Sequence, residues 1–560
     1  MEDGAGAAGS ERGDRRAALS VFLILLAVYS ATFTGLPDNP DAEVEFQTTR
    51  SLARDASFAL GDTPEARAIV AARFNVAPGR PGREQRFYSW HGPGQALAGV
   101  PFYWCGALLA RAFTAIEARH AATTLRGYPR SEYFAHLCVS WRNPLLAAAT
   151  AGLLVLTALR LGLARTAAWL TGLTFGLCSF AWPQARSTLS DVQATFLTFL
   201  AFHELVRVRA TLVEERAPRL GHLAVLGAAL AAAVLTRVVL LPVALVLLGA
   251  TLVVLHRAPR RGRWLTALGV PLVLGAALFL WVNYARFGSP LETGYGAVLA
   301  SGTFFSYPPL LGLAGLLVSP GKGLVWLAPG LVLFPLGWVL ARRRGEALWP
   351  WTALGVALAC MGPVACMQAW TGAYTYGPRY VLPMVPIAWL CVGYALADGR
   401  LARVAASLLL ALGFVVQLPA ALVDYNTHLE LAVQAARVRW PDARGPTQRD
   451  QDEARFLALC WDWGFAAPWA HWRILFHRLA GRGEQFPVRE LFFLDSDLVL
   501  EPAERRERGF EHLAWVDLRQ RLGGRTGPAW LAVTALFLAG GLLASRSLDR
   551  SGCAAPPTGP

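Results

Sequence analysis

Long apolar blocks separated by short polar segments dominate this sequence. Most blocks run for roughly 15 to 20 residues and lack the regular polar positions of a helix that lies on a soluble core. A helix of that length, at about 1.5 Å per residue, crosses the roughly 30 Å hydrocarbon layer of a bilayer. The pattern therefore predicts an all-α fold, a polytopic transmembrane helical bundle with about twelve spans.

The predicted spans follow the apolar blocks closely. They are placed at 17–35, 143–161, 166–183, 192–206, 222–236, 238–255, 264–282, 324–340, 348–367, 380–397, 404–422 and 528–544. Segment 97–113 is also apolar, but a full crossing there would invert every later loop. We therefore expect a helix that lies at, or dips into, the outer leaflet.

This threading divides the chain into seven parts. They are a cytoplasmic N-terminus (1–16), the first span (17–35), a first extracytoplasmic loop with juxtamembrane helices (36–142), a multi-span core (143–422), an extracytoplasmic loop or small domain (423–527), the last span (528–544) and a cytoplasmic tail (545–560). The first span has no small-residue cleavage site, so we expect a retained anchor rather than a signal peptide. The 423–527 segment mixes charged residues with tryptophan, which indicates a small extracytoplasmic α-rich domain or an elaborate cap.

Composition and charge agree with a membrane protein. Hydrophobic residues make up 54% and charged residues 16%, too apolar for a soluble surface. The net charge of +14 comes from short arginine clusters between the apolar blocks, for example at 12–16, 207–219, 257–263 and 342–344. Such clusters keep loops in the cytoplasm, so we expect a multi-pass cell (inner) membrane protein with both termini cytoplasmic. The sequence shows no basic groove with interleaved aromatic residues, so no nucleic-acid partner is expected. The eight cysteines show no metal-ligand spacing.

Carboxylates gather immediately after the first span. Asp38, Asp41, Glu43 and Glu45 fall within eight residues at the expected membrane surface, where acids are costly unless solvated, paired or used. Asp41 and Glu43 are near enough to converge on one hydroxyl, one ammonium or one divalent ion. The segment is either a solvated interfacial loop or the location of a general base.

A second acid, Asp191, stands at the outer mouth of the third and fourth spans, close to Arg186. Asp191 opens a helix, so one alternative is that Ser190 or Asp191 is simply its N-cap. Its expected position on the same membrane face as Asp41 favours a shared site instead.

Three later segments rich in Gly, Pro and aromatic residues each offer a cation near the outer leaflet. They are 283–295, 319–324 with Lys322, and 370–380 with Tyr376, Arg379 and Tyr380. Arg379 suits a phosphate through a bidentate guanidinium contact, or snorkels to lipid headgroups. The tyrosines suit sugar faces or the aromatic belt of the membrane interface. His91, in the Tyr-Ser-Trp-His-Gly-Pro-Gly turn at 88–94, is either structural or part of the site.

The order of these motifs resembles the GT-C glycosyltransferase superfamily, near the bacterial protein O-mannosyltransferase and lipid A aminoarabinose transferase group. The resemblance rests on the acids after the first span, the 88–94 turn, Asp191, and the NYARFGSP, SPGKGL and YGPRY stretches. It covers about residues 17 to 425.

The resemblance implies an enzyme, a hexosyl- or pentosyltransferase that moves a sugar from a polyprenyl-phosphate donor to a lipid, glycan or protein acceptor on the extracytoplasmic face, with inversion. Asp41 or Glu43 would be the general base, and Asp191 would orient the acceptor or a metal. The donor phosphate would contact Arg379 and Lys322, with His91, Arg186, Tyr376 and Tyr380 as further substrate contacts. Whether a divalent metal is required stays open.

Two departures from the family pattern bear on these roles. The family commonly has adjacent Asp and Glu, whereas Ala42 separates Asp41 from Glu43, so either acid could be the base. His91 stands where many relatives have lysine, which makes a phosphate contact there weaker or pH-dependent. The competing hypotheses are a polytopic transporter, which would place its ionisable groups near the midplane, and a catalytically inactive relative that binds lipid-linked sugar.

Overall fold

A computed structural model describes residues 2–36, 39–72, 75–79, 86–121, 124–125, 128–129, 132–256, 261–443, 445, 447–503, 508–521 and 527–545. Asp38, one of the four acids after the first span, lies outside these residues. The described chain is almost entirely helical. Its strands form three short antiparallel pairs: β1 (Val76–Pro78) with β2 (Phe87–Ser89), β3 (Thr124–Leu125) with β4 (Tyr128–Pro129), and β5 (Phe486–Pro487) with β6 (Val499–Leu500).

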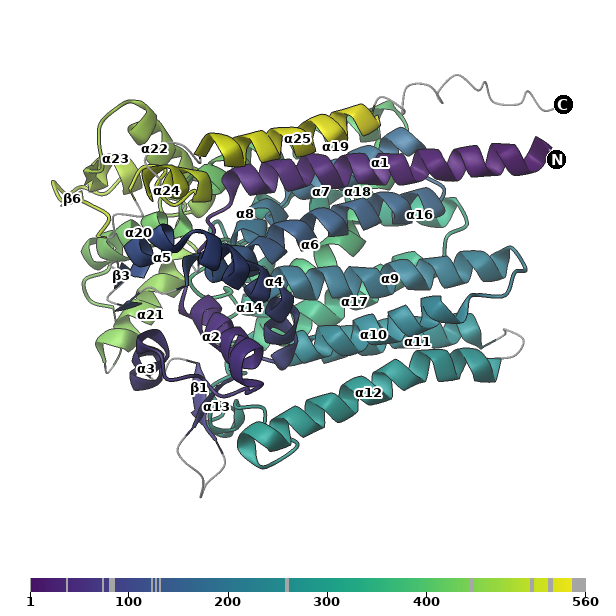
Figure 1. The fold of residues 1–560 in the computed structure, drawn as a ribbon. Coiled ribbons are helices and arrows are strands. Elements are labelled where there is room, and N and C mark those ends of the chain that lie inside the picture. The colour runs from purple at the N-terminus through teal and green to yellow at the C-terminus, as the bar shows by residue number, and fades with distance from the viewer. Residues whose placement is uncertain are drawn as a thin grey trace.

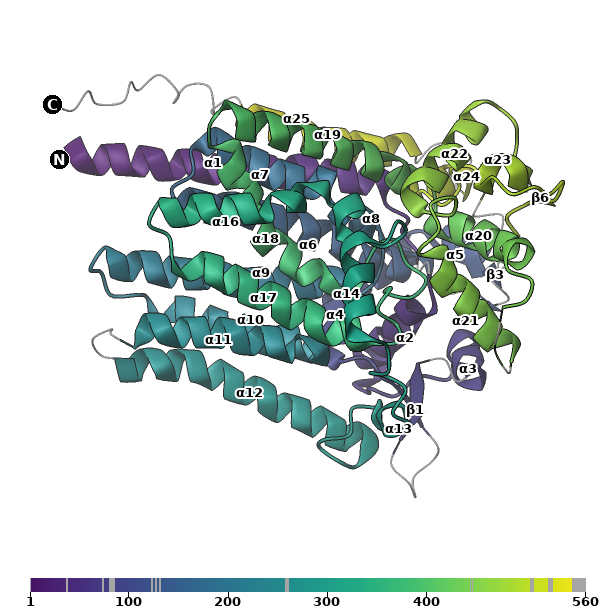
Figure 2. The ribbon, with the colours of Figure 1, turned by 180° about the vertical axis from the view of Figure 1, so that it is seen from behind.

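Long apolar helices run side by side and form the body of the molecule (Figure 1; Figure 2 shows the other side). They are α1 (Glu2–Thr32), α6 (Tyr133–Arg160), α7 (Arg165–Cys178), α9 (Asp191–Val213), α10 (Leu220–Thr236), α11 (Leu241–Leu255), α12 (Arg261–Phe287), α16 (Phe334–Arg343), α17 (Leu348–Cys366), α18 (Val385–Leu396), α19 (Arg400–Leu422) and α25 (Gly527–Ser545). Among the described residues, 7 helical stretches are long and apolar enough to cross a membrane, and three shorter apolar helices accompany them. The predicted all-α membrane fold is confirmed.

One predicted span is not a single helix. The segment 324–340 divides into α15 (Leu324–Leu327), a 3-10 turn η2 (Pro329–Leu333) and α16. Pro329 and Pro335 lack the backbone N–H that continues an α-helix, so each begins a new helical piece rather than extending the previous one. A similar 3-10 turn, η3 (Arg379–Met384), precedes α18.

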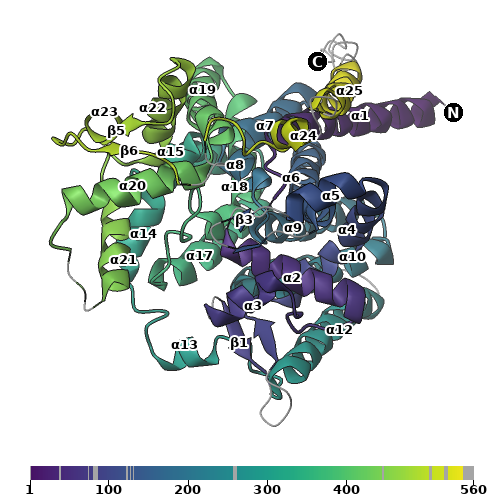
Figure 3. The same cartoon turned by 60° about the vertical axis from the view of Figure 1, so that its left-hand side comes forward.

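A second layer of shorter helices covers one end of the bundle (Figure 3). The first predicted loop supplies α2 (Pro40–Asp55), α3 (Pro64–Ala71), α4 (Pro93–Ala112) and α5 (Thr114–Ala121). The C-terminal segment supplies α20 (Tyr425–Arg439), α21 (Gln448–Leu459), α22 (Ala467–Leu479), α23 (Val488–Phe492) and α24 (Ala514–Arg521). Helix α4, the predicted leaflet helix, packs against α2 and α6. It is not among the 7 described helical stretches that are long and apolar enough to cross a membrane.

Ion pairs join the loops at the opposite end. Arg165 pairs with Asp14 at 3.1 Å, and Arg209 pairs with Glu346 at 2.5 Å. Segments far apart in the sequence therefore bring their arginine clusters together at one end, away from the covering layer. Which end faces the cytoplasm remains the prediction made from those arginines.

The remaining short helices, α8 (Ala181–Arg186), α13 (Gly296–Ala300) and α14 (Pro309–Val318), connect longer ones. Helix α13 and the turns at 88–92 and 369–380 contribute residues to one large cavity. The candidate site is built around this cavity.

Candidate active site

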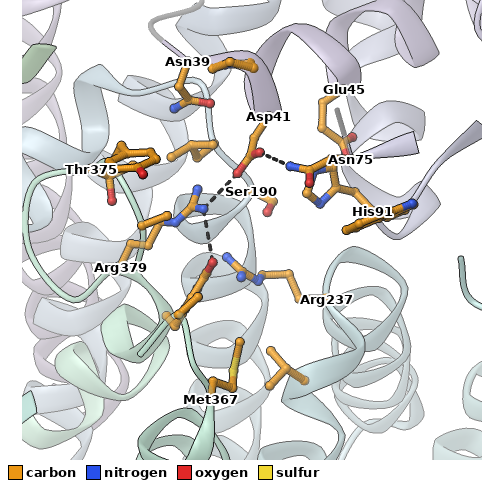
Figure 4. Close-up of a pocket in the computed structure, with 18 of the residues that line it drawn as sticks. Asn39, Asp41, Glu45, Asn75, His91, Ser190, Arg237, Met367, Thr375 and Arg379 are labelled. Atoms are coloured by element: carbon orange, nitrogen blue, oxygen red, sulfur yellow. Dashed lines mark hydrogen bonds and ion pairs between the residues drawn. The ribbon is translucent and has the colours of Figure 1, made fainter. Parts of the chain in front are cut away.

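A cavity of about 1400 Å³ lies between the bundle and the covering layer (Figure 4). Its polar lining includes Asn39, Asp41, Glu45, Asn75, His91, Gln95, Ser190, Arg237, Arg286, Tyr295, Thr375, Arg379, Tyr380, Glu430, Gln434, Arg437 and Asp452. Apolar side chains of the spanning helices line the rest, including Val238, Leu241, Phe279, Pro363 and Met367. The cavity thus joins an apolar part near the bundle to a polar part under α20 and α21.

Helix α2 brings Asp41 to the cavity. The Asn39 side chain caps this helix by accepting the Ala42 N–H at 3.0 Å, and Pro40 occupies its first turn. Asp41 follows in that first turn, where the helix dipole stabilises a negative charge. The start of α2 therefore fixes the carboxylate at the cavity wall.

Two groups hold the Asp41 carboxylate in place. Arg379 donates to it at 2.9 Å, and the Asn75 amide donates to its other oxygen. Burial by itself raises the pKa of Asp41, but the guanidinium groups of Arg379 and Arg237 oppose that effect, and the pKa lies below its ordinary value. Asp41 is consequently ionised at neutral pH.

Asp191 belongs to the same cluster of charged side chains as Asp41 and Arg379. It is 1% exposed and forms ion pairs with Arg237 and, at 3.8 Å, with Arg379. Its neighbour Ser190 occupies the cap position of α9 and lines the cavity, whereas Asp191 lies behind Arg237. Asp191 therefore orients the two arginines, and they in turn lie between it and Asp41.

Tyr380 supports both cations. Arg379 donates to its hydroxyl at 3.2 Å, and the Arg237 guanidinium lies 4.6 Å from the centre of its ring. An aromatic face attracts a guanidinium without neutralising it. Two arginines thus share one tyrosine and keep positive charge at the cavity wall.

The turn that carries His91 packs closely against the end of α10, which holds it in place. A Cβ at Gly92 would come within 2.2 Å of the Leu235 carbonyl oxygen, and one at Gly94 within 2.6 Å of the Thr236 hydroxyl. Only glycine allows this approach to the end of α10. Arg286 then donates to the carbonyls of Ser89 and His91, both at 3.1 Å, which holds the turn from α12.

The His91 ring faces the cavity without a hydrogen-bond partner for its Nε2 atom among the described residues. Burial lowers the pKa of His91, although the Asp41 carboxylate opposes that effect. The ring is therefore neutral near pH 7 and offers a hydrogen bond rather than a positive charge.

The structure separates the two acids that the sequence could not rank. Glu43 points away from the cavity, where it meets His136 at 3.2 Å and accepts from Gln47 at 2.8 Å. Residues two positions apart in a helix lie on different faces, so Asp41 and Glu43 cannot both reach one hydroxyl. Of the two, Asp41 alone lines the cavity.

Three other predicted substrate contacts lie outside the cavity wall. Lys322 is buried behind the wall and donates to the carbonyls of Ala373 and Thr375, which it holds in the loop that lines the cavity. Burial lowers the pKa of Lys322 to about 8. Its geometry matches a loop support rather than a direct phosphate contact.

Arg186 and Tyr376 are packed in the core beside the cavity. Arg186 donates to the carbonyls of Thr32 and Ala420, both at 2.7 Å, and so ties the end of α1 to α19. The Tyr376 ring lies 5.5 Å from that of His471. Both side chains therefore join elements of the fold and do not line the main cavity.

Several residues that line the cavity were not predicted as site residues from the sequence. Glu45 lies four residues after Asp41, a spacing that places both on one helical face. Arg237 interrupts two apolar blocks at the end without arginine clusters, which was a signal for a special role. Arg286 is the cation of the 283–295 segment, but the sequence gave it no separate role. Asn75 gave no signal, because only the packing of its segment brings it to the site.

The described residues include no group of three or more His, Cys, Asp or Glu that could hold a metal ion. Of the three acids with predicted catalytic roles, Asp41 and Asp191 are each paired with an arginine. Their charge is thus balanced by cations of the chain itself.

No protein-family model and no curated protein matches the sequence. Among solved structures, the fold is similar to ArnT from Cupriavidus metallidurans bound to undecaprenyl phosphate, with 13% identity and a TM-score of 0.46. It is also similar to ArnT from the same organism in the apo state, with 12% identity and a TM-score of 0.47. Each comparison covers 95% of this chain and 77% of the other chain. At these values the likeness concerns the arrangement of helices and carries no argument about the reaction.

Proposed function

We propose that this protein is a membrane glycosyltransferase that moves a sugar from a polyprenyl-phosphate donor to an acceptor on the extracytoplasmic face. One observation carries the proposal. An ionised carboxylate, Asp41, shares a large cavity with two clustered arginines, Arg379 and Arg237, and the cavity continues between apolar helices. A general base, a phosphate site and a path for a lipid tail are the parts that such a transfer needs.

The donor would lie with its phosphate against the arginines and its tail along the apolar lining. Val238, in the 3-10 turn before α11, Leu241 at the start of α11 and Phe279 on α12 lead from Arg237 toward the hydrocarbon layer. A phosphate bound by two guanidinium groups is anchored in place while its charge is balanced. The tail would then remain in a lipid-like environment.

In the proposed reaction, Asp41 accepts the proton of the acceptor hydroxyl as its oxygen attacks the anomeric carbon. The bond from that carbon to the phosphate oxygen breaks, and the electron pair leaves with the phosphate. Attack from the side opposite the leaving group inverts the anomeric configuration. Arg379 and Arg237 stabilise the additional negative charge on the departing phosphate.

The Asp41–Arg379 pair gives this reaction an order. While the pair is intact, Arg379 helps to hold the pKa of Asp41 low, which makes the carboxylate a weak base. A donor phosphate would compete for the same guanidinium and release Asp41 from it. The pKa of Asp41 would then rise, so the base would be activated only when the donor is present.

The acceptor would enter through the polar part of the cavity. Glu430, Gln434 and Arg437 on α20 and Asp452 on α21 line this part, and Arg437 pairs with Asp452 at 3.2 Å. Charged groups of both signs suit a hydrophilic acceptor group rather than a second lipid tail. On this proposal, the 423–527 segment forms the acceptor side of the site.

The test is transfer of radiolabelled sugar by the purified protein in lipid, from a panel of polyprenyl-phosphate sugars with membrane extract as the acceptor source. Asp41→Asn and Asp191→Asn should lose transfer, and Asp62→Asn, an exposed acid of the same loop, should retain it. Transfer unchanged in both site variants would contradict the proposal. Failure of every donor, with solute flux across proteoliposomes, would support a transporter instead.

A further inference from the structure

Glu45 is a second carboxyl group in the cavity that the proposed reaction does not use. It lies one helical turn after Asp41 on α2, and both side chains line the cavity (Figure 4). Glu45 is only 5% exposed, and its Oε1 atom has no hydrogen-bond partner among the described residues. A buried polar atom without a partner is costly, so an unpaired one at a cavity wall indicates a group that a ligand completes.

The charges around Glu45 come from several elements. Asp41 lies on the same helix, Arg142 faces it from α6, Arg286 from α12, and Arg237 from between α10 and α11. The Tyr295 hydroxyl is a further titratable neighbour that interacts with it. These groups surround Glu45 with more positive than negative charge.

The cations nevertheless do not pair with Glu45. Arg142 donates to the Gln95 carbonyl at 2.9 Å, and Arg286 donates to Asn283 at 2.8 Å besides holding the His91 turn. No ion pair found among the described residues includes Glu45. Burial consequently raises the pKa of Glu45 to about 8, although Arg142 and Arg286 oppose the rise, so the group is protonated at neutral pH.

We propose that Glu45 is a donor-binding residue that donates a hydrogen bond from its protonated carboxyl to a phosphate oxygen of the lipid-linked donor. The inference rests on the proposed function, because it requires a phosphate at the arginine cluster. A neutral acid adds a hydrogen bond there without adding negative charge. An ionised Glu45 would have no proton to donate and would repel the phosphate.

Two variants separate these states of the side chain. Glu45→Gln keeps a neutral hydrogen-bond donor at every pH, whereas Glu45→Ala removes the donor. Glu65→Gln is the matched control, because Glu65 is also buried, at 3% exposure, in the same predicted loop but does not line the cavity. Binding of undecaprenyl phosphate to each protein in nanodiscs would be measured from pH 7 to 9.5.

The expected result is a difference between wild type and Glu45→Gln that appears only at alkaline pH. The Kd of the wild type should rise by about tenfold relative to Glu45→Gln as Glu45 ionises. Taking this ratio cancels titration of the probe and of the other residues. Glu45→Ala should bind about tenfold more weakly than the wild type at pH 7, because a hydrogen bond to a charged group is lost. Glu65→Gln should follow the wild type throughout.

Other outcomes would overturn the inference. Equal alkaline weakening in the wild type and Glu45→Gln would show that Glu45 does not sense the phosphate, as would unchanged binding by Glu45→Ala. Binding retained by Glu45→Gln with transfer abolished would make Glu45 a proton carrier instead. Failure of the proposed function looks different: the wild type would then bind the probe no more tightly than Arg379→Ala at pH 7.

Discussion

The two faces of helix α2 show how differently neighbouring acids can be used. On one face, Glu43 is satisfied within the protein by His136 and Gln47. On the other, Asp41 and Glu45 line the cavity. Asp41 is balanced by an arginine, whereas one oxygen of Glu45 has no hydrogen-bond partner in the described part of the chain. Acids that lie close together in the sequence thus occupy two faces of one helix, a structural face with Glu43 and a cavity face with Asp41 and Glu45. Completed hydrogen bonding marks the first, and incomplete or exchangeable pairing marks the second.

The largest expected effect separates these faces by activity. Asp41→Asn should reduce kcat/KM for transfer by about a thousandfold, because a general base contributes roughly 10² to 10⁴ in rate. Glu43→Gln should stay within about tenfold of the wild type, since the amide can still hydrogen-bond to His136. Steady-state kinetics on both variants would measure the difference. Equal losses, with both proteins folded, would erase the distinction between the faces.

The cation that balances the cavity face should matter next. Arg379→Ala should weaken donor binding by about a hundredfold, because a charge-assisted contact to phosphate is lost and Asp41 is left facing the ligand. Donor and acceptor KM values would be determined separately. Arg437→Ala, at the polar part of the cavity, is the matched control and should leave the donor KM unchanged. A donor KM unaffected by Arg379→Ala would limit this residue to its ion pairs with Asp41 and Asp191.

Glu45, on the cavity face, should make the stability of the folded protein depend on pH even when no substrate is bound. Its pKa is higher in the folded protein than its ordinary value of 4.5. Its contribution to stability is therefore complete below pH 4.5 and is lost as the pH rises through about 8. The stability of Glu45→Gln relative to the wild type should increase over that range by a few kcal/mol. Thermal unfolding at pH 5, 7 and 9 would measure it, and a constant difference would contradict the burial argument.

The smallest effect belongs to the structural face. Glu43→Ala should reduce the free energy of unfolding by about 1 to 2 kcal/mol, because Gln47 and His136 each lose a hydrogen-bond partner. Transfer activity should persist at temperatures where the variant is folded. Unfolding in denaturant together with the transfer assay would test both parts. A loss of activity without a loss of stability would place Glu43 in the reaction after all.

Much of the fold followed from the sequence, and the site followed only in part. The apolar blocks predicted the all-α membrane fold, and a helix or a series of helical pieces occurs at each of the twelve predicted spans. Of the predicted site residues, Asp41, His91, Arg379 and Tyr380 line the cavity, and Asp191 lies directly behind its wall. Lys322, Arg186 and Tyr376 were predicted substrate contacts, but their side chains hold loops and helices of the fold together and do not line the cavity. Their backbone contacts could not be read from residue type.

The sequence by itself determined which segments enter the membrane, because hydrophobicity over a span is a local property of consecutive residues. It also determined that acids and cations gather at one membrane level, because the lengths of the blocks set where each loop emerges. Only the tertiary structure decided which of those charges meet. The Asp41–Arg379 pair joins residues 338 positions apart, and the partner that a charge finds depends on how distant helices pack rather than on its neighbours along the chain. The same packing left one oxygen of Glu45 without a hydrogen-bond partner among the residues that the structure describes.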